Sequence, residues 1–325
     1  MLRLGEYANS FEILIMKKGC RLVTRSDFDG LVCAILLSEI NIIDRVKFAH
    51  PVDLQHNLLT ITNEDIITNL PYNENAYMVF DHHISEAVRI KDKPDNYILD
   101  PTAPSAARVV YDHFGGRKNF HHVEFYEMMA AVDKCDSGQF TREEILNPKD
   151  WVLLNFLMDS RTGLGRFKDF RISNYDLMLE LVELCRDLPC AEVLESPDVK
   201  ERVDLYFQHV EPSKEQVQKC IRIVGNIGIY DLRNEEPIFA QNRFLIYAMY
   251  PDINISITMM RDKQGRNTVL AVGKSVTNRT SKTNIGPLLL KYGGGGHSNA
   301  GACQISHHHV EQVLQELIDQ ITADG

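Results

Sequence analysis

The sequence predicts an α/β protein, with an N-terminal doubly wound, mainly parallel sheet, a helical insert and a smaller α+β domain at the C-terminus. Three observations support this prediction. Short apolar runs rich in β-branched and aromatic residues alternate with helix-like segments up to about residue 140, as they do in parallel sheets. Acidic residues and histidines directly follow several of these runs. From residue 225 onward, strand-like runs follow one another, which is typical of a separate α+β unit.

The first strand–helix unit carries the strongest local signal. Residues 21–24 favour a strand, and an acidic turn leads from it directly into the helix-like run 31–40. Such a unit opens a parallel sheet. A helix over residues 106–114 is expected to be capped by Thr102 or Ser105 and to stop at two glycines. Further strands are predicted at 45–50, 65–69, 76–80 and just before residue 100, and a further helix at 125–132.

The second half of the chain is predicted to begin with helices and to end with strands. We expect the helical insert at about 140–212, a linker at Pro212 and the two residues after it, and a helix at 215–221. The predicted domains are therefore residues 1–212 and 213–325. Strands are predicted at 227–232, 244–249, 253–260 and 268–272, and a closing helix at 310–321.

The composition places the chain among globular proteins of ordinary make-up. It has 325 residues, of which 44% are hydrophobic and 25% charged, with a net charge of −10. This acidity argues against a general nucleic-acid coat protein, which needs a basic surface. Seven cysteines without a CxxC pair favour a reducing compartment. No secretory signal is predicted, and no apolar stretch approaches the ~20 residues of a membrane helix, so we expect a cytoplasmic protein.

Acids and imidazoles gather where two predicted strands end. Asp81, His82 and His83 follow the strand at 76–80, and Asp27 and Asp29 follow the strand at 21–24. Ligands collect at the carboxyl ends of strands in open α/β sheets, and carboxylate with imidazole suits Mn, Zn or Fe. The alternatives are a solvated polar turn at residues 81–83 and a helix N-cap at Asp29.

Five ordered motifs resemble those of the DHH phosphoesterase superfamily: SDFDG at 26–30, DHH at 81–83, DPTAPSAA at 100–107, DSG at 136–138 and GGGGH at 293–297. This superfamily includes RecJ-like exonucleases, nano-RNases, cyclic-dinucleotide phosphodiesterases, exopolyphosphatase-like proteins and family II inorganic pyrophosphatases. The last motif is similar to the signature of the C-terminal domain that accompanies many of its members. Residues 140–215 are the part of the chain that the resemblance covers least.

The resemblance implies a pair of Mn ions and a set of residues to hold them. It assigns Asp27, Asp29, His82 and Asp136 as ligands, with Asp81 orienting His82. The resemblance also places His83 at the phosphate. We predict His83, Arg25 and Asp81 as catalytic residues, of which His83 and Arg25 stabilise charge on the phosphate.

Two positions depart from the superfamily pattern. The first-motif histidine falls on Val23 or Arg25, and the bridging aspartate of the second motif falls on Asn69, with Asp65 a poorer candidate. An asparagine brings no charge to a bridge between two cations. We therefore expect one metal site that keeps most of its ligands, Asp29, His82 and Asp136, and a second that keeps chiefly Asp27.

The glycine run at 293–296 indicates a phosphate-binding loop, since successive backbone N–H groups can cradle an anion. The resemblance assigns this region to the substrate end remote from the cut. The predicted substrate-binding residues are Gly294, Gly295, Gly296, His297, Lys274 and Arg279.

Two other segments leave alternatives open. The basic stretch 161–171 suits a polyanion or a stacked base, although a solvated loop with inward phenylalanines is the usual outcome. We favour the binding role here, because glycines and arginines recur as they do in phosphate-binding loops. The three histidines at 307–309 lack neighbouring acids, so we expect an exposed cluster without a metal role.

The sequence therefore predicts a metal-dependent phosphoesterase that acts on a short anionic chain, either an oligonucleotide, a nucleotide or a polyphosphate, in a cleft between the two domains. Mn is the expected metal, no membrane is expected, and a homodimer is left open. A second hypothesis is a binding protein of the same fold that has lost its chemistry. A third is an interaction scaffold.

Overall fold

The computed structural model describes residues 16–90, 92–167, 169–262 and 264–325, and the chain forms two compact units. The first unit comprises the described residues up to Gln139 together with Lys149–Ser160 and Gly165–Val203. The second comprises Phe140–Pro148, Arg161–Leu164 and the described part of Asp204–Gly325. The predicted boundary between residues 212 and 213 stays a prediction. Among the described residues, no helix combines the length and apolarity needed to cross a membrane.

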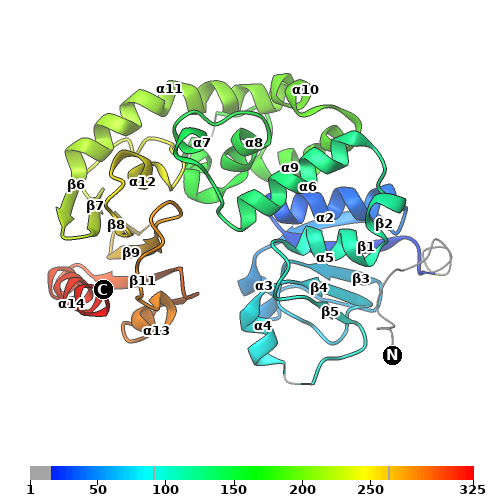
Figure 1. The fold of residues 1–325 in the computed structure, drawn as a ribbon, viewed down its shortest axis with the longest axis horizontal. Coiled ribbons are helices and arrows are strands. Elements are labelled where there is room, and N and C mark those ends of the chain that lie inside the picture. The colour runs from blue at the N-terminus through cyan, green and yellow to red at the C-terminus, as the bar shows by residue number, and fades with distance from the viewer. Residues whose placement is uncertain (1–15, 91, 168, 263) are drawn as a thin grey trace. The chain divides into compact units, whose positions relative to one another are not determined.

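The first unit is built on a sheet of five parallel strands in the order β2-β1-β3-β4-β5 (Figure 1). The predicted α/β class is confirmed. Parallel pairing aligns the carboxyl ends of β1, β3 and β4 at one edge, because Thr24 lies opposite Thr68 and Thr68 opposite Phe80. The strands are β1 (Cys20–Arg25), β2 (Ile43–Ala49), β3 (Asp65–Thr68), β4 (Met78–Asp81) and β5 (Tyr97–Leu99).

Side chains alternate between the two faces of this sheet, and both faces are buried. Val23, Ile67 and Val79 belong to one apolar cluster, to which Leu54 of helix α3 also contributes. On the neighbouring β4 residue, Phe80 packs against the ring of Phe114, which follows helix α5. Helices in this part are α2 (Phe28–Glu39), α3 (Pro51–Gln55), α4 (Ile84–Arg89), α5 (Ala106–His113) and α6 (Val123–Asp136).

Helices fill the middle of the chain, as expected. They are α7 (Arg142–Leu146), α8 (Asp150–Met158), α9 (Asn174–Asp187), α10 (Cys190–Glu195) and α11 (Pro197–Cys220). The predicted linker at Pro212 is wrong, because this proline lies inside α11. Residues on both sides of it are held: Tyr206 is buried, and Gln216 bonds Pro237 and Phe239. These contacts outweigh the helix-breaking tendency of proline.

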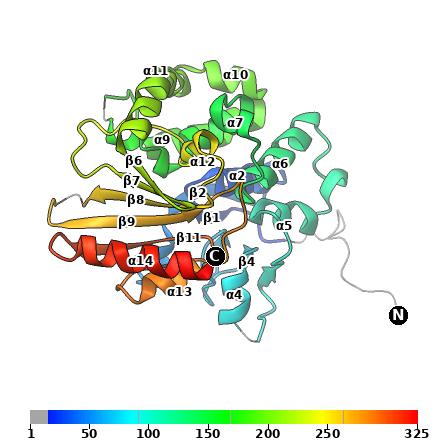
Figure 2. The same ribbon diagram turned by 60° about the vertical axis from the view of Figure 1, so that its left-hand side comes forward.

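The second unit contains a six-stranded sheet in the order β10-β11-β9-β8-β7-β6, in which only the β7–β8 pair is parallel. Helix α14 lies along this sheet (Figure 2) and buries Leu314, Leu317 and Ile321 in its core. The elements are β6 (Ile221–Val224), β7 (Ile227–Asp231), α12 (Leu245–Met249), β8 (Ile255–Arg261), β9 (Asn267–Lys274), α13 (Ile285–Leu290), β10 (Gly295–Gly296), β11 (Ala300–Ser306) and α14 (Val310–Asp324).

The strand predicted at residues 244–249 is wrong, since these residues form the short helix α12. Asn242 starts the helical turn, accepting from the N–H of Phe244 through its side chain and from the N–H of Leu245 through its carbonyl. The Asn242 amide is itself fixed by Ile145 and Tyr206. A short run that is buried on all sides shows no period, so its sequence pattern could not separate helix from strand.

Candidate metal centre

The turn after β1 is shaped by a close backbone approach. Asp27 is the N-cap of α2, and its Oδ1 accepts from the N–H of Gly30 at 3.0 Å. A Cβ on Gly30 would lie 1.9 Å from the carbonyl oxygen of Arg25 and 2.7 Å from Oγ1 of Thr24. Glycine is therefore required at this position. Asp29, the capping alternative, instead lies in the first turn of the helix.

The side chain of Asp29 is buried and points to the start of α5. Its Oδ2 and Oδ1 accept from the N–H groups of Ala106 and Ala107 at 3.0 and 2.7 Å. Ser105 caps that helix, which decides between the two predicted caps. Burial raises the pKa of Asp29 to about 6, while the charge of His82 and the two N–H donors pull the pKa down.

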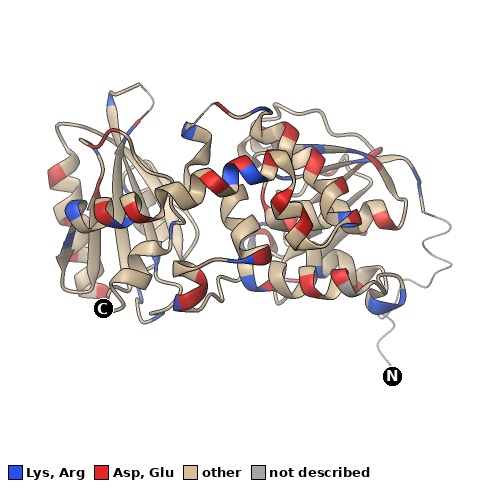
Figure 3. Cartoon of the chain, turned by 90° about the horizontal axis from the view of Figure 1, so that it is seen from above, with Lys and Arg blue, Asp and Glu red and all other residues tan. Residues whose placement is uncertain are grey.

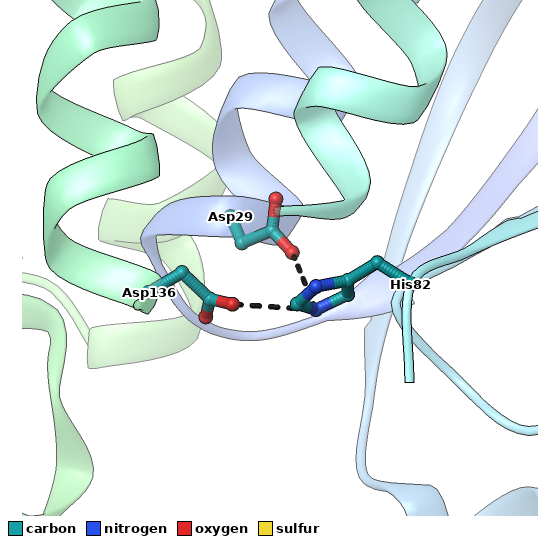
Figure 4. Close-up of side chains that lie close together, drawn as sticks. All are labelled: Asp29, His82 and Asp136. Atoms are coloured by element: carbon teal, nitrogen blue, oxygen red, sulfur yellow. Dashed lines mark ion pairs between the residues drawn. The ribbon is translucent and has the colours of Figure 1, made fainter. Parts of the chain in front are cut away.

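The ring nitrogen Nε2 of His82 faces the carboxylate of Asp29. The other ring nitrogen, Nδ1, lies 3.2 Å from the carbonyl oxygen of Ala103, so Nδ1 carries a proton and Nε2 is the nitrogen that can offer a lone pair to a metal ion. Nε2 is buried and has no hydrogen-bond partner among the described residues. It lies 3.9 Å from Oδ2 of Asp29 and 3.2 Å from Oδ2 of Asp136 (Figure 4). A buried imidazole nitrogen between two carboxylates needs positive charge, which a proton on Nε2 or a bound metal ion can supply.

Asp136 reaches the site from the last residue of α6. That helix is fixed to α5 because Asp133 accepts from Ser105 and Arg108 at 2.8 and 3.0 Å. Burial raises the pKa of Asp136 well above its ordinary value, and repulsion from Asp29 adds to this. Two carboxylates that repel each other at close range are stabilised by a shared positive ion.

Asp29, His82 and Asp136 are the one group of at least three potential metal ligands found in the part of the chain that the structure describes, with ligand atoms within 4.8 Å of one another. Two carboxylate oxygens and an imidazole suit a divalent ion such as Mn, Fe or Zn. The donor set therefore fits a divalent metal. The structure brings together three of the five predicted ligands, whose role as ligands stays a prediction.

The predicted pairing of Asp81 with the ring of His82 is wrong. Asp81 is buried, and its Oδ1 lies 2.7 Å from Nδ1 of His83, while His82 gives it only a backbone N–H at 2.8 Å. Burial lowers the pKa of His83, but the hydrogen bond and charge of Asp81 outweigh it, so the pKa rises. Asp81 therefore favours a protonated His83 beside the metal ligands.

Asp27 and Asn69, the other predicted ligands, lie outside the three-residue group and bond each other. The Nδ2 of Asn69 donates to Oδ1 of Asp27 at 3.1 Å. The other carboxylate oxygen of Asp27, Oδ2, lies 2.9 Å from Nε of Arg25. Asn69 follows β3 with a positive φ of 53°, and its backbone N–H donates to the carbonyl of Phe80. The predicted alternative, Asp65, is remote from this edge and pairs with Arg21 at 2.6 Å.

The predicted substrate-binding residues all lie in the second unit. Lys274 ends β9, Arg279 is exposed in the loop that follows it, and His297 is exposed after β10. The structure thus places them in one unit and the predicted metal ligands Asp29, His82 and Asp136 in the other.

The glycine run forms a tight hairpin with β11. A Cβ on Gly294 would lie 2.3 Å from the carbonyl oxygen of Ala302, and one on Gly296 would lie 2.3 Å from that of Ala300. The N–H of Gly294 donates to the carbonyl of Leu289. Close packing therefore accounts for Gly294 and Gly296, whereas Gly295 is exposed and a Cβ there would meet nothing within 4 Å.

The end of the basic segment makes structural contacts. Nε of Arg171 donates to Asp198 of α11 at 2.8 Å, and Phe170 stacks on the buried guanidinium of Arg202 at 4.1 Å. Lys168 lies outside the described residues. These contacts support the structural alternative for this stretch.

The histidines at 307–309 also make local contacts. Nδ1 of His307 lies 3.0 Å from Oγ1 of Thr268, and Nδ1 of His309 lies 3.0 Å from Oγ of Ser306. They do not belong to the ligand group found among the described residues.

Several residues of the site were missed by sequence reasoning. Asp133 lies one helical turn before Asp136, so its spacing could have indicated it. Tyr97, whose hydroxyl donates to Oδ2 of Asp81 at 3.3 Å, ends up there only through strand pairing. The carbonyl of Ala103 has no signal in the sequence, because any residue can supply it.

The chain is similar to a solved structure of the pGpG-specific phosphodiesterase PggH from Vibrio cholerae, with 55% identity, a TM-score of 0.83 and coverage of 94% of this chain and 100% of that chain. An exopolyphosphatase-related protein from Bacteroides fragilis has 12% identity and a TM-score of 0.51, covering 95% and 93%. RecJ from Thermus thermophilus in complex with Mn²⁺ has 13% identity and a TM-score of 0.51, covering 94% and 52%. These last two show the fold alone. No protein-family model and no curated protein matches the chain.

The identity with PggH extends over nearly the whole chain, so the chain belongs to the DHH phosphoesterase superfamily. It is a phosphoester hydrolase, as the motifs at the sheet edge predicted. Of the three functional hypotheses, the enzyme is therefore confirmed.

Proposed function

We propose that this enzyme hydrolyses short linear oligonucleotides, with the dinucleotide pGpG as its preferred substrate. The substrate comes from the similarity to PggH, which has 55% identity and covers 94% of this chain. The main support for metal-dependent chemistry is Nε2 of His82, which is buried between two carboxylates and has no hydrogen-bond partner among the described residues. A solvent-exposed polar turn would not leave a nitrogen in that state.

Asp29, His82 and Asp136 hold the metal ion, which we propose to be Mn²⁺. When bound, a divalent ion supplies Lewis acidity to the phosphoryl group and to water. The protein prepares the site: α5 fixes Asp29 through two N–H groups, and Ala103 fixes the tautomer of His82.

Two cationic groups complete the phosphate side of the site. His83 is held by Asp81 and is biased toward its protonated form, so it donates to a phosphoryl oxygen as negative charge grows there. Arg25, the last residue of β1, also stabilises this growing negative charge. We propose that Lys274, Arg279, His297 and the exposed Gly295 bind the remote end of the substrate. We further propose a cytoplasmic location and leave homodimer formation open.

The test is a substrate comparison with equal concentrations of pGpG, a cyclic dinucleotide, a single-stranded 20-mer and short-chain polyphosphate, each with Mn²⁺. We expect pGpG to give two molecules of GMP, with a kcat/KM at least about 100-fold above the other three. The control is Arg261→Ala, an exposed residue of the second unit, which should match wild type. Faster cleavage of polyphosphate or of the 20-mer would contradict the proposed substrate.

A further inference from the structure

Both carboxylate oxygens of Asp27 are engaged by the protein itself. Oδ1 accepts from the N–H of Gly30 at 3.0 Å and from the amide of Asn69 at 3.1 Å, and Oδ2 faces Nε of Arg25 at 2.9 Å. An oxygen that accepts two hydrogen bonds has used its usual acceptor capacity. Asp27 is therefore held away from the three-residue ligand group, although it lies only two residues from Asp29.

The charges around the site balance with one metal ion. A divalent cation neutralises Asp29 and Asp136, while Arg25 already neutralises Asp27. Asn69 is uncharged, and its amide nitrogen, which donates to Asp27, cannot ligate a cation. A second divalent ion at Asp27 would meet a guanidinium, and the carboxylates that Asp27 repels, Asp29 and Asp136, are already the ligands of the first ion. The residues present do not fit a second ion.

Arg25 is free to act on a substrate. Its side chain is 38% exposed, and beyond its ion pair with Asp27 none of its N–H groups makes a hydrogen bond to any residue in the described ranges. A guanidinium fixed by one carboxylate still has donors for bidentate contact with a phosphate.

We propose that this enzyme works with a single divalent ion, and that Arg25 and Asn69 together occupy the place of a second one, with Arg25 providing the second positive charge at the phosphate. The number of bound metal ions does not depend on the proposed function, whereas the role of Arg25 at the phosphate rests on it.

The direct test is the Mn²⁺ stoichiometry of chelator-treated full-length protein, measured by calorimetry and native mass spectrometry without substrate. We expect one ion per chain. The double variant R25H/N69D removes a positive charge and adds a negative one, a change equal to the charge of one divalent ion, and should bind two. A tight count of two in the wild type, or of one in the folded double variant, would overturn the proposal.

A matched control is R45H/N57D. Arg45 and Asn57 are exposed, and Asn57 has a positive φ of 53°, the value found at Asn69. This variant carries the same substitutions away from the site and should still bind one ion. Binding of two ions by the control would also overturn the proposal, because the gain would then be a general charge effect.

Arg25→Gln provides a second route should the double variant fail to fold. We expect kcat/KM for pGpG to fall at least about 10-fold, with Mn²⁺ still at one per chain, and Arg25→Lys to recover part of the loss. Unchanged kinetics would overturn the role of Arg25. If wild type bound one ion but left pGpG intact, the proposed substrate would fail and the metal count would stand.

Discussion

Gly30 shows how closely a single residue can tie the local fold to the site. It lies in the first turn of α2, where its missing side chain lets the helix start against the carbonyl of Arg25. Two residues of the proposed site lie on either side of this contact: Arg25 precedes the turn and Asp29 lies within it. Any outward shift of the helix start would move both.

Gly30→Ala is therefore expected to destabilise the protein and to damage the site. Its Cβ would sit 1.9 Å from a backbone oxygen that cannot rotate away, and we expect a loss of about 3 kcal/mol in the free energy of unfolding, at the upper end of overpacking costs. Urea unfolding measures this loss. Gly165→Ala is the control, because the added Cβ would meet its nearest atom at 3.4 Å. Equal stability of Gly30→Ala and wild type would show that the turn is not constrained.

At the scale of elements, helix α11 is anchored at its start by a small charged network. Asp198 is buried in the first turn and accepts from Arg171, and Arg202 donates to the carbonyls of Asp198 and Ile172. This network fixes the loop that precedes α9. It also shows that one arginine of the basic segment, Arg171, is engaged by the protein itself.

Asp198→Asn tests this network through pH. The hydrogen bond from Arg171 lowers the pKa of Asp198, so its stabilisation is present above the ordinary Asp pKa near 4 and is lost as pH falls through the lowered pKa. We expect the variant to lose about 1 kcal/mol at pH 7, kept small because Arg171 is 66% exposed. The difference from wild type should shrink toward pH 3. Asp319→Asn, on the exposed face of α14, is the control, and a pH-independent difference would contradict the account.

At the scale of the whole molecule, sequence patterns predicted the features that follow from the order of the parallel strands. They failed where contacts between segments far apart in the sequence determine the local structure. The acids after β1 and the histidine after β4 lie at one edge because parallel strands align their ends. Conversely, Pro212 and residues 244–249 are governed by contacts with remote segments. The partner of Asp81 could not be inferred either, because His82 and His83 compete for one carboxylate and only geometry separates them.

The charge distribution agrees with a small substrate. Acidic and basic residues are interspersed along the helices (Figure 3), and the net charge is −10. A long nucleic acid needs an extended basic surface, whereas a dinucleotide needs a few fixed donors. We propose that in this chain those donors are the residues around the predicted metal ligands, Lys274 at the end of β9 and the exposed Arg279 after it.

The most direct test of the central claim is metal-restored hydrolysis by full-length protein stripped with chelator. pGpG is offered with and without added Mn²⁺ to wild type, His82→Ala and His121→Ala, the last being an exposed histidine remote from the ligand group. We expect hydrolysis to require the added ion, to persist in His121→Ala and to fall at least about 100-fold in His82→Ala, whose fold is checked by circular dichroism. Full activity of a folded His82→Ala protein, or of wild type without metal, would contradict the assignment of this centre.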